Sequence, residues 1–193
     1  MSAWLKKLFS LLLFLVFFTP AGFTIDRTTA LLIEKEIKKH INEIIKIRRF
    51  LHMNPELSNR EYETSKLITS KLMSLGIEVK SGIAGTGVSG LLEGDQEGFT
   101  IGLRADMDAL PIHEKTHLPY TSLNPGVMHA CGHDIHMSIA LGTAIVLSNL
   151  KDKIKGNIKF IFQPAEEGPP KGEKGGASLM VKEGVLQEPP VMA

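Results

Sequence analysis

Hydrophobic residues recur at three- and four-residue steps in the first third of the chain. In residues 28–53 the apolar positions follow this spacing, and charged side chains lie between them. The pattern predicts an amphipathic helix, which Pro55 ends because proline disfavours the helical conformation in the residue before it. A second helix is predicted from residues 58–61 (SNRE), which have the spacing of a capping box, to a stop at Gly76.

Short strand-like segments alternate with helical ones in the remaining sequence. Residues 88–92 and 99–103 read as strands separated by the turn-like residues 93–95 (EGD), and residues 157–163 alternate apolar and polar positions with the period of a strand. Helices are predicted at residues 136–150 and 176–183. Interleaved strands and helices indicate an α/β layered domain.

The N-terminus has a different pattern. Residues 1–21 (MSAWLKKLFSLLLFLVFFTPA) combine two lysines, an apolar run over residues 8–18 and small residues that allow cleavage after Ala21. This is the pattern of a secretory signal peptide, and the run is short for a membrane span. An uncleaved anchor and a buried helix remain open alternatives. We expect an exported protein, periplasmic or secreted, with no stable membrane association once the signal is removed.

The amino-acid composition excludes several classes of protein and gives no support for others. The chain has 193 residues, with 22 Lys+Arg against 21 Asp+Glu, so charge gives no argument for nucleic acid binding. A hydrophobic content of 43% excludes wholesale disorder. The single cysteine, Cys131, excludes an intramolecular disulfide framework and a four-cysteine zinc module. In an oxidising compartment a lone cysteine is unusual unless something holds it, and a metal ion is one such partner.

The densest chemistry lies in residues 128–136 (MHACGHDIH). Cys131 and His133 are our candidate ligands for a divalent metal, because a thiolate and an imidazole lie two residues apart around a flexible glycine. Asp134 is expected to support a ligand imidazole through a hydrogen bond. His129 and His136 are expected to be supporting or structural. The alternative is an ordinary free cysteine near surface histidines.

Two acidic segments could complete such a site. Residues 163–168 (QPAEEG) follow a predicted strand, and one of Glu166 and Glu167 could bind a metal while the other faces water as a general base. Residues 103–111 (LRADMDALP) place Asp106 and Asp108 two positions apart, so both could point to the same side. The alternatives are an exposed acidic loop and a polar strand end with Arg104 paired to an aspartate.

Four segments in this order resemble a known family. RRFLHMNPELSNREYET (residues 48–64), LRADMDALPI (103–112), MHACGHDIH (128–136) and QPAEEG (163–168) are similar to the metal-dependent amidohydrolase branch of the aminoacylase and carboxypeptidase metallopeptidase superfamily. The resemblance implies a three-layer α/β/α zinc-peptidase-like catalytic domain with an inserted lid domain. Residues 22–193 would be the N-terminal part of that catalytic domain, which is incomplete, and the lid domain is absent.

The resemblance also implies an activity and a set of roles. The family hydrolyses the amide bond of small N-acyl amino acids. Cys131 and His133 would bind a centre of two divalent metal ions, manganese or zinc, with Glu167 as a further ligand. Glu166 would be the general base, and Asp108 would match a supporting position near the metals. The full-length protein could form a homodimer.

The sequence departs from the family pattern at its C-terminus. Family members supply two further metal-binding histidines, one in an FGLH-like segment, whereas no histidine follows His136 here. The metal site is therefore expected to be incomplete, and this chain alone is expected to hydrolyse N-acyl amino acids poorly or not at all. A non-catalytic metal-binding fragment and a hydrolase with Cys131 as nucleophile are the competing hypotheses.

Overall fold

The computed structural model describes residues 25–192. The chain divides into two compact units, Met1–Lys35 and Glu36–Ala193. The described part of the first unit begins helix α2 (Arg27–Met53). The Asp26 carboxylate accepts hydrogen bonds from the Thr29 backbone N–H at 3.0 Å and from the Thr29 hydroxyl at 2.5 Å. The predicted amphipathic helix is confirmed, and the predicted signal peptide lies outside the described residues.

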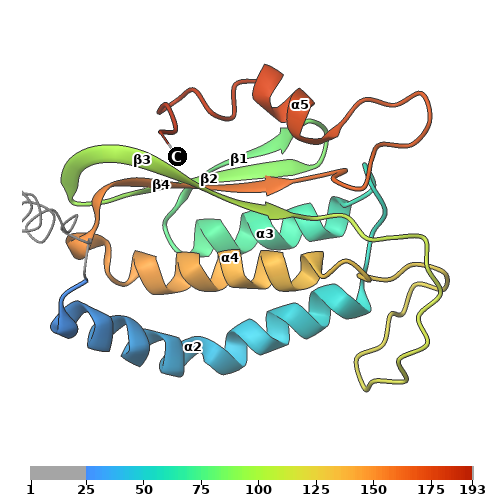
Figure 1. Ribbon diagram of the computed structural model, residues 1–193, viewed down its shortest axis with the longest axis horizontal. Helices are drawn as coiled ribbons and strands as arrows, with labels where there is room; N and C mark the ends of the chain where they lie inside the picture. The colour runs from blue at the N-terminus through green and yellow to red at the C-terminus, as the bar shows by residue number, and fades with distance from the viewer. Residues whose placement is uncertain (1–24, 193) are drawn as a thin grey trace, which may run out of the picture. The chain divides into compact units, whose positions relative to one another are not determined.

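A mixed four-stranded sheet organises the second unit (Figure 1). Its strands are β1 (Glu78–Ile83), β2 (Gly87–Glu93), β3 (Gln96–Asp106) and β4 (Lys155–Gln163), in the order β1-β2-β4-β3. β3 and β4 are parallel, whereas β1 with β2 and β2 with β4 are antiparallel. Because Asp106 pairs with Gln163, the carboxyl ends of β3 and β4 lie together, and the segments that follow both strands begin at the same edge.

Helices cover both faces of this sheet. α3 (Tyr62–Ser74) and α4 (His133–Ser148) lie on one face and α5 (Gly176–Lys182) on the other, as Figure 1 shows. A short 3-10 turn, η1 (Lys151–Lys153), precedes β4. The predicted α/β class with helical layers around a sheet is confirmed. No helix among residues 25–192 is long and apolar enough to cross a membrane.

The main core lies between the sheet and α3 and α4. Apolar side chains from α3, α4, three strands, the end of α2 and the residue after β3 are almost completely buried there; the largest are Leu51, Ile68, Leu72, Met107, Met137, Leu141, Phe160 and Phe162. Small residues of α4 let other elements approach closely. A Cβ atom at Gly142 would lie 2.8 Å from Ile44 Cδ1 of α2, so a larger residue there would require the Ile44 side chain to shift.

The structure adds one strand and extends one helix relative to the sequence pattern. β1 was not predicted, because its residues EVKSGI are mostly exposed and carry no clear alternation. The strand exists through its pairing with β2, which is a tertiary effect. α4 begins at His133, three residues before the predicted start, so His133 and Asp134 belong to the first helical turn.

The predicted capping box at residues 58–61 is wrong. Glu61 occupies the N-cap position of α3 without a side-chain capping bond. The Glu56 carboxylate accepts hydrogen bonds from the backbone N–H groups of Glu63 at 3.1 Å and Thr64 at 2.8 Å instead. Ser58 and Glu61 make long-range contacts that belong to the candidate site.

Candidate metal centre

Three side chains from distant positions meet beyond the carboxyl ends of β3 and β4. Cys131 precedes α4, His133 is its first residue, and Glu167 follows β4. One potential ligand atom from each lies within 4.8 Å of the other two. His133 is buried, whereas Cys131 and Glu167 are exposed. The structure therefore places a thiol, an imidazole and a carboxylate at one open site.

The ring of His133 is held in a defined orientation. Its Nδ1 donates a hydrogen bond of 2.8 Å to the backbone carbonyl of Asp108 and lies 3.4 Å from Asp108 Oδ1. Its Nε2 faces Glu166 Oε2 at 3.7 Å and Glu167 Oε1 at 3.9 Å. A neutral ring with its proton on Nδ1 would present a free electron pair on Nε2 toward these glutamates.

Asp108 connects all parts of the site. Its carboxylate accepts hydrogen bonds from the backbone N–H groups of Glu166 and Glu167, both at 3.0 Å, and from the Ser58 hydroxyl at 2.7 Å. Burial by itself would raise the pKa of Asp108, but the hydrogen bonds with His133, Ser58 and the two amides lower it to about 2. Asp108 is therefore an ionised group that orients His133 and the Glu166-Glu167 segment together.

The electrostatics favour a bound cation. Burial opposes the charged form of His133, but hydrogen bonds with Asp108 and the nearby carboxylates raise its pKa to about 9. A hydrogen bond with Glu167, together with burial and neighbouring carboxylates, raises the pKa of the Cys131 thiol. The site thus attracts positive charge, and protons supply it when no metal does. A soft thiolate, an imidazole and a carboxylate fit a divalent cation, which would displace those protons.

Asp134 and His129, which the sequence analysis placed near the metal ligands, have other surroundings in the structure. Asp134 Oδ2 makes a hydrogen bond with His52 Nδ1 and an ion pair with Arg48 Nε, both at 2.8 Å, rather than contacting His133. Asp134 therefore fixes the start of α4 to the end of α2. His129 is buried, and neither of its ring nitrogens has a hydrogen-bond partner among the described residues.

Glu61 is a site residue that the sequence analysis missed. It is completely buried, and it accepts hydrogen bonds from the Thr86 hydroxyl at 2.6 Å and from the backbone N–H of Ala165 at 2.9 Å. Three successive N–H groups, those of residues 165–167, therefore bind the carboxylates of Glu61 and Asp108. Ala165 has a φ of 50°, a left-handed conformation that these bonds help to hold. No sequence signal separates this role of Glu61 from helix capping.

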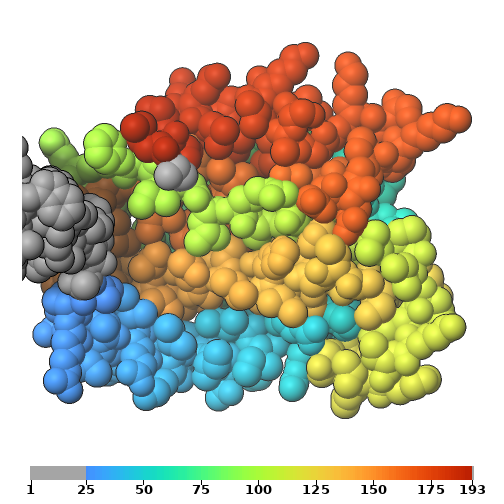
Figure 2. Space-filling model, viewed as in Figure 1, coloured from blue at the N-terminus to red at the C-terminus, as the bar shows by residue number. Residues whose placement is uncertain are grey.

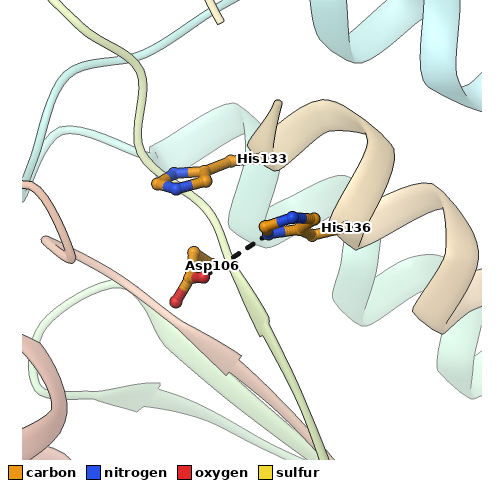
Figure 3. A group of neighbouring side chains, drawn as sticks. All are labelled: Asp106, His133 and His136. Carbon is orange, nitrogen blue, oxygen red and sulfur yellow. Dashed lines mark ion pairs between the residues drawn. The ribbon is translucent and has the colours of Figure 1, made fainter. Parts of the chain in front are cut away.

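A second group of potential ligands adjoins the first. Asp106, His133 and His136 also offer ligand atoms that all lie within 4.8 Å of one another. Figure 3 shows these three side chains next to one another. Asp106 ends β3, and His136 lies one turn into α4. The sequence analysis left the role of Asp106 open and treated His136 as supporting. Their proximity depends on how α4 packs against β3, which spacing in the sequence does not reveal.

The fold and this site define a class: an α/β domain with a thiolate, imidazole and carboxylate site suited to a divalent metal. A family model described as Peptidase family M20/M25/M40 matches residues 102–193. The chain therefore carries part of an M20 peptidase domain, and the resemblance to the metal-dependent amidohydrolase branch is confirmed.

Individual relatives agree with this assignment. The chain is 49% identical over 155 residues to thermostable carboxypeptidase 2 of Saccharolobus solfataricus, covering 80% of this chain and 39% of the relative. It is 46% identical over 157 residues to the N-acyl-L-amino acid amidohydrolase of Geobacillus stearothermophilus, covering 79% of this chain and 41% of the relative. The chain thus spans about two fifths of the length of these curated relatives.

A solved structure shows the same fold. The YxeP protein of Bacillus subtilis, described as a dinuclear metal binding peptidase from the M20 family, matches with a TM-score of 0.70 and 43% identity. The match covers 77% of this chain and 40% of that protein. The described sheet and helices therefore correspond to part of an M20 catalytic domain.

Proposed function

We propose that this chain supplies part of the catalytic centre of a metal-dependent hydrolase that cleaves the amide bond of N-acyl amino acids. The observation that carries the proposal is the meeting of Cys131, His133 and Glu167, with Glu166 beside them. The name of the Geobacillus relative, N-acyl-L-amino acid amidohydrolase, supports this substrate class. The name N-acetyl-L-cysteine deacetylase, carried by a Bacillus subtilis relative at 46% identity, supports it independently.

We assign Cys131, His133 and Glu167 to hold a divalent cation in a centre of two. The description of YxeP as dinuclear supports the number, and the candidate metals are zinc and manganese. A thiolate ligand favours zinc over manganese, which prefers oxygen ligands. When bound, such cations polarise a carbonyl group and make water nucleophilic at neutral pH.

Glu166 is our candidate general base. Its Oε2 lies 3.7 Å from His133 Nε2, and its side chain is 38% exposed, so it reaches the open side of the site. The hydrogen bond from its backbone N–H to Asp108 Oδ1 fixes the position of its main chain. In this role Glu166 would accept a proton from water and return it to the leaving amine.

A cysteine nucleophile is the competing mechanism, and the electrostatics of Cys131 oppose it. Reactive cysteines have a lowered pKa, whereas Glu167 and its neighbours raise the pKa of Cys131. Activity that resists chelators and is abolished by thiol alkylation would favour the nucleophile and contradict our proposal.

The first test measures metal binding by the chain itself. Titration with Co(II) is expected to give a thiolate-to-cobalt charge-transfer band in the near ultraviolet, and Cys131→Ser is expected to abolish it. His113→Gln, which changes an exposed histidine, is the matched control and should keep the band. Absence of the band from the folded parent chain would contradict the assignment of Cys131.

The second test measures the reaction. The product of the whole gene, including any coding sequence after codon 193, is expected to release amino acids from N-acetyl derivatives. Chelators should abolish this activity, and zinc or manganese should restore it. Glu166→Gln should lower kcat by at least about 100-fold, the usual contribution of a general base, while cobalt binding persists. Unchanged kcat in this variant would remove Glu166 from the mechanism.

We also propose that residues 1–21 act as a signal peptide and that the mature protein is exported. The two lysines, the apolar run over residues 8–18 and the small residues at the cleavage position support this. N-terminal sequencing of protein recovered outside the cytoplasm should begin at Gly22. Homodimerisation of the full-length protein is a further expectation, which sedimentation of the whole gene product checks.

A further inference from the structure

A polar pocket lies on the face of the sheet opposite the main core. It has a volume of about 250 Å³ and is lined by residues of β1, β2 and β4 and of the segment that follows α5. Figure 1 shows α5 and this C-terminal segment on the side of the sheet away from α3 and α4. The charged and hydroxyl side chains of the lining are Lys80, Ser89, Lys159, Glu183 and Glu188. Pockets for drug-sized ligands measure roughly 300–1,000 Å³, so this one suits a smaller ligand.

Lys159 brings a buried ammonium group to this pocket. The residue is 4% exposed, and its Nζ donates hydrogen bonds to the backbone carbonyls of Val185 at 3.2 Å and Pro189 at 2.9 Å. An ammonium group has three N–H donors, so one remains for a ligand. Among residues 25–192 no carboxylate forms an ion pair with Lys159. Since lysines are rarely buried without a charged partner, this group is suited to hold an anion.

Lys80 and Ser89 add two further donors to the same pocket. They are register partners on β1 and β2, so their side chains lie next to each other on one face of the sheet. In the part of the chain that the structure describes, neither the exposed Lys80 ammonium group nor the Ser89 hydroxyl has a hydrogen-bond or ion-pair partner. Ser89 is only 8% exposed. A hydroxyl group that is buried to this extent is costly unless it forms a hydrogen bond, which a ligand in the pocket would supply.

The two glutamates of the lining do not cancel the charge of the two lysines. Glu183 Oε2 already accepts a hydrogen bond of 2.7 Å from the backbone N–H of Ala84. Burial and then the positive charge of Lys80 lower the pKa of the Lys159 amine, and the attraction of Glu188 opposes this less strongly. At the Lys159 amine, repulsion from Lys80 therefore exceeds attraction to Glu188, and an anion between the two lysines would relieve it.

We propose that this pocket binds a small ligand through a phosphate group, which Lys80, Ser89 and Lys159 hold together. A phosphate group carries up to two negative charges and several acceptor oxygens, which match two ammonium groups and a hydroxyl donor. A carboxylate matches them less well, because it carries one charge and two oxygens. None of the three residues belongs to the candidate metal centre, so the inference does not depend on the proposed function.

The test measures phosphate binding in the presence of a chelator, so that no metal ion at the Cys131 site binds the anion. Calorimetric titration of the 193-residue chain with inorganic phosphate, at constant ionic strength, should show saturable binding to one site. Lys80→Met should weaken the affinity by about 10-fold, the usual effect of losing a hydrogen bond between charged groups, and Ser89→Ala should also weaken it. Lys155→Met, which changes an exposed lysine of β4 outside the pocket, is the matched control and should bind phosphate as the parent does.

Three results would overturn the proposal: no saturable binding by the folded parent chain, equal affinity in the parent, Lys80→Met and Ser89→Ala, or acetate binding as tightly as phosphate. Lys159→Met should abolish binding, but it also removes two hydrogen bonds to the C-terminal segment. Lys80→Met is therefore the deciding variant, because its side chain is exposed and makes no contact that the fold would lose. Circular dichroism of each variant checks that it is folded.

Discussion

At the scale of single residues, the buried Asp108 carboxylate holds the candidate metal ligands in position through its hydrogen bonds. Asp108 bonds the ring of His133 and the amides of Glu166 and Glu167, and Ser58 bonds Asp108 in turn. An anion in this position stabilises the ligand imidazole and fixes two loop residues at the same time. Metal affinity should therefore depend strongly on a residue that offers no atom to the metal.

Asp108→Asn tests this dependence. The amide keeps the size of the side chain but cannot accept two backbone hydrogen bonds, the Ser58 bond and the His133 contact together. Cobalt affinity should fall by about 10- to 100-fold, the usual effect of losing a partner of a ligand histidine. Ser58→Ala, which removes one bond to Asp108, should have a smaller effect. Equal affinity in parent and Asp108→Asn chains would contradict the role of Asp108.

The buried carboxyl group of Glu61 should make the stability of the fold depend on pH. Burial outweighs its hydrogen bonds and raises the pKa of Glu61 above its ordinary value of 4.5. The folded state therefore holds the proton more tightly than the unfolded state. Stability from this group is fully present below pH 4.5 and is lost as pH rises through the folded pKa.

Glu61→Gln should remove this pH dependence. A glutamine can accept the Ala165 hydrogen bond through its oxygen and donate to the Thr86 hydroxyl, so the contacts survive. The free energy of unfolding is measured in urea for the variant and the parent. As pH rises from 4.5, the variant should become more stable relative to the parent. A stability difference that stays constant across this pH range, or that changes so that the parent gains stability over the variant, would contradict a raised pKa of Glu61.

At the scale of secondary-structure elements, the close approach of β3 and β4 depends on glycine. Gly156 in β4 has a φ of 85°, and a Cβ atom there would lie 2.1 Å from the backbone oxygen of Phe99 in β3. Because the clash is with backbone, a larger side chain cannot be accommodated by a rotamer change. These two strands carry the site at their carboxyl ends, so this contact supports the metal centre.

A pair of variants separates the clash from backbone strain. Gly126 also has a positive φ, of 80°, but a Cβ atom there meets nothing within 4 Å. Gly126→Ala should cost about 1–2 kcal/mol from the left-handed conformation alone. Gly156→Ala should cost clearly more, as measured by chemical denaturation of both variants. Equal costs would show that β3 can move away from β4 freely.

At the scale of the whole chain, one edge of the sheet is open. β3 is an edge strand, and the bridge between Thr100 and Val191 is the isolated pairing seen on it among residues 25–192. Its side chains Phe99 and Ile101 are 74% and 56% exposed. In Figure 2 the yellow-green atoms of β3 are visible between α4 and the C-terminal segment. Such an apolar edge strand favours pairing with other chains.

Self-association through β3 is therefore expected. The 193-residue chain should show concentration-dependent association in sedimentation velocity, and Ile101→Lys should reduce it by placing a charge on the exposed strand. Leu31→Lys, which changes an exposed leucine of α2, is the control and should have no effect. Association that persists unchanged in Ile101→Lys would locate the contact elsewhere.

The sequence determined the local elements and the ligand chemistry. The sequence pattern located α2, α3, α4, α5 and three strands. Periodicity was the basis for α2 and β4, because an amphipathic helix and an alternating strand leave a repeat in the sequence. The local density of ligand types made Cys131 and His133 candidate metal ligands, and the resemblance to a known family gave Glu166 and Glu167 their expected roles.

Only the tertiary structure decided how these parts combine. In the folded chain Asp106 lies beside His136, and Asp134 contacts His52 and Arg48. Glu61, which the sequence analysis placed in a helix cap, accepts a hydrogen bond from Ala165. These contacts join residues up to 104 positions apart in the chain. Spacing along a sequence carries no information about which distant groups share a buried hydrogen bond, since that depends on how helices pack across the ends of parallel strands.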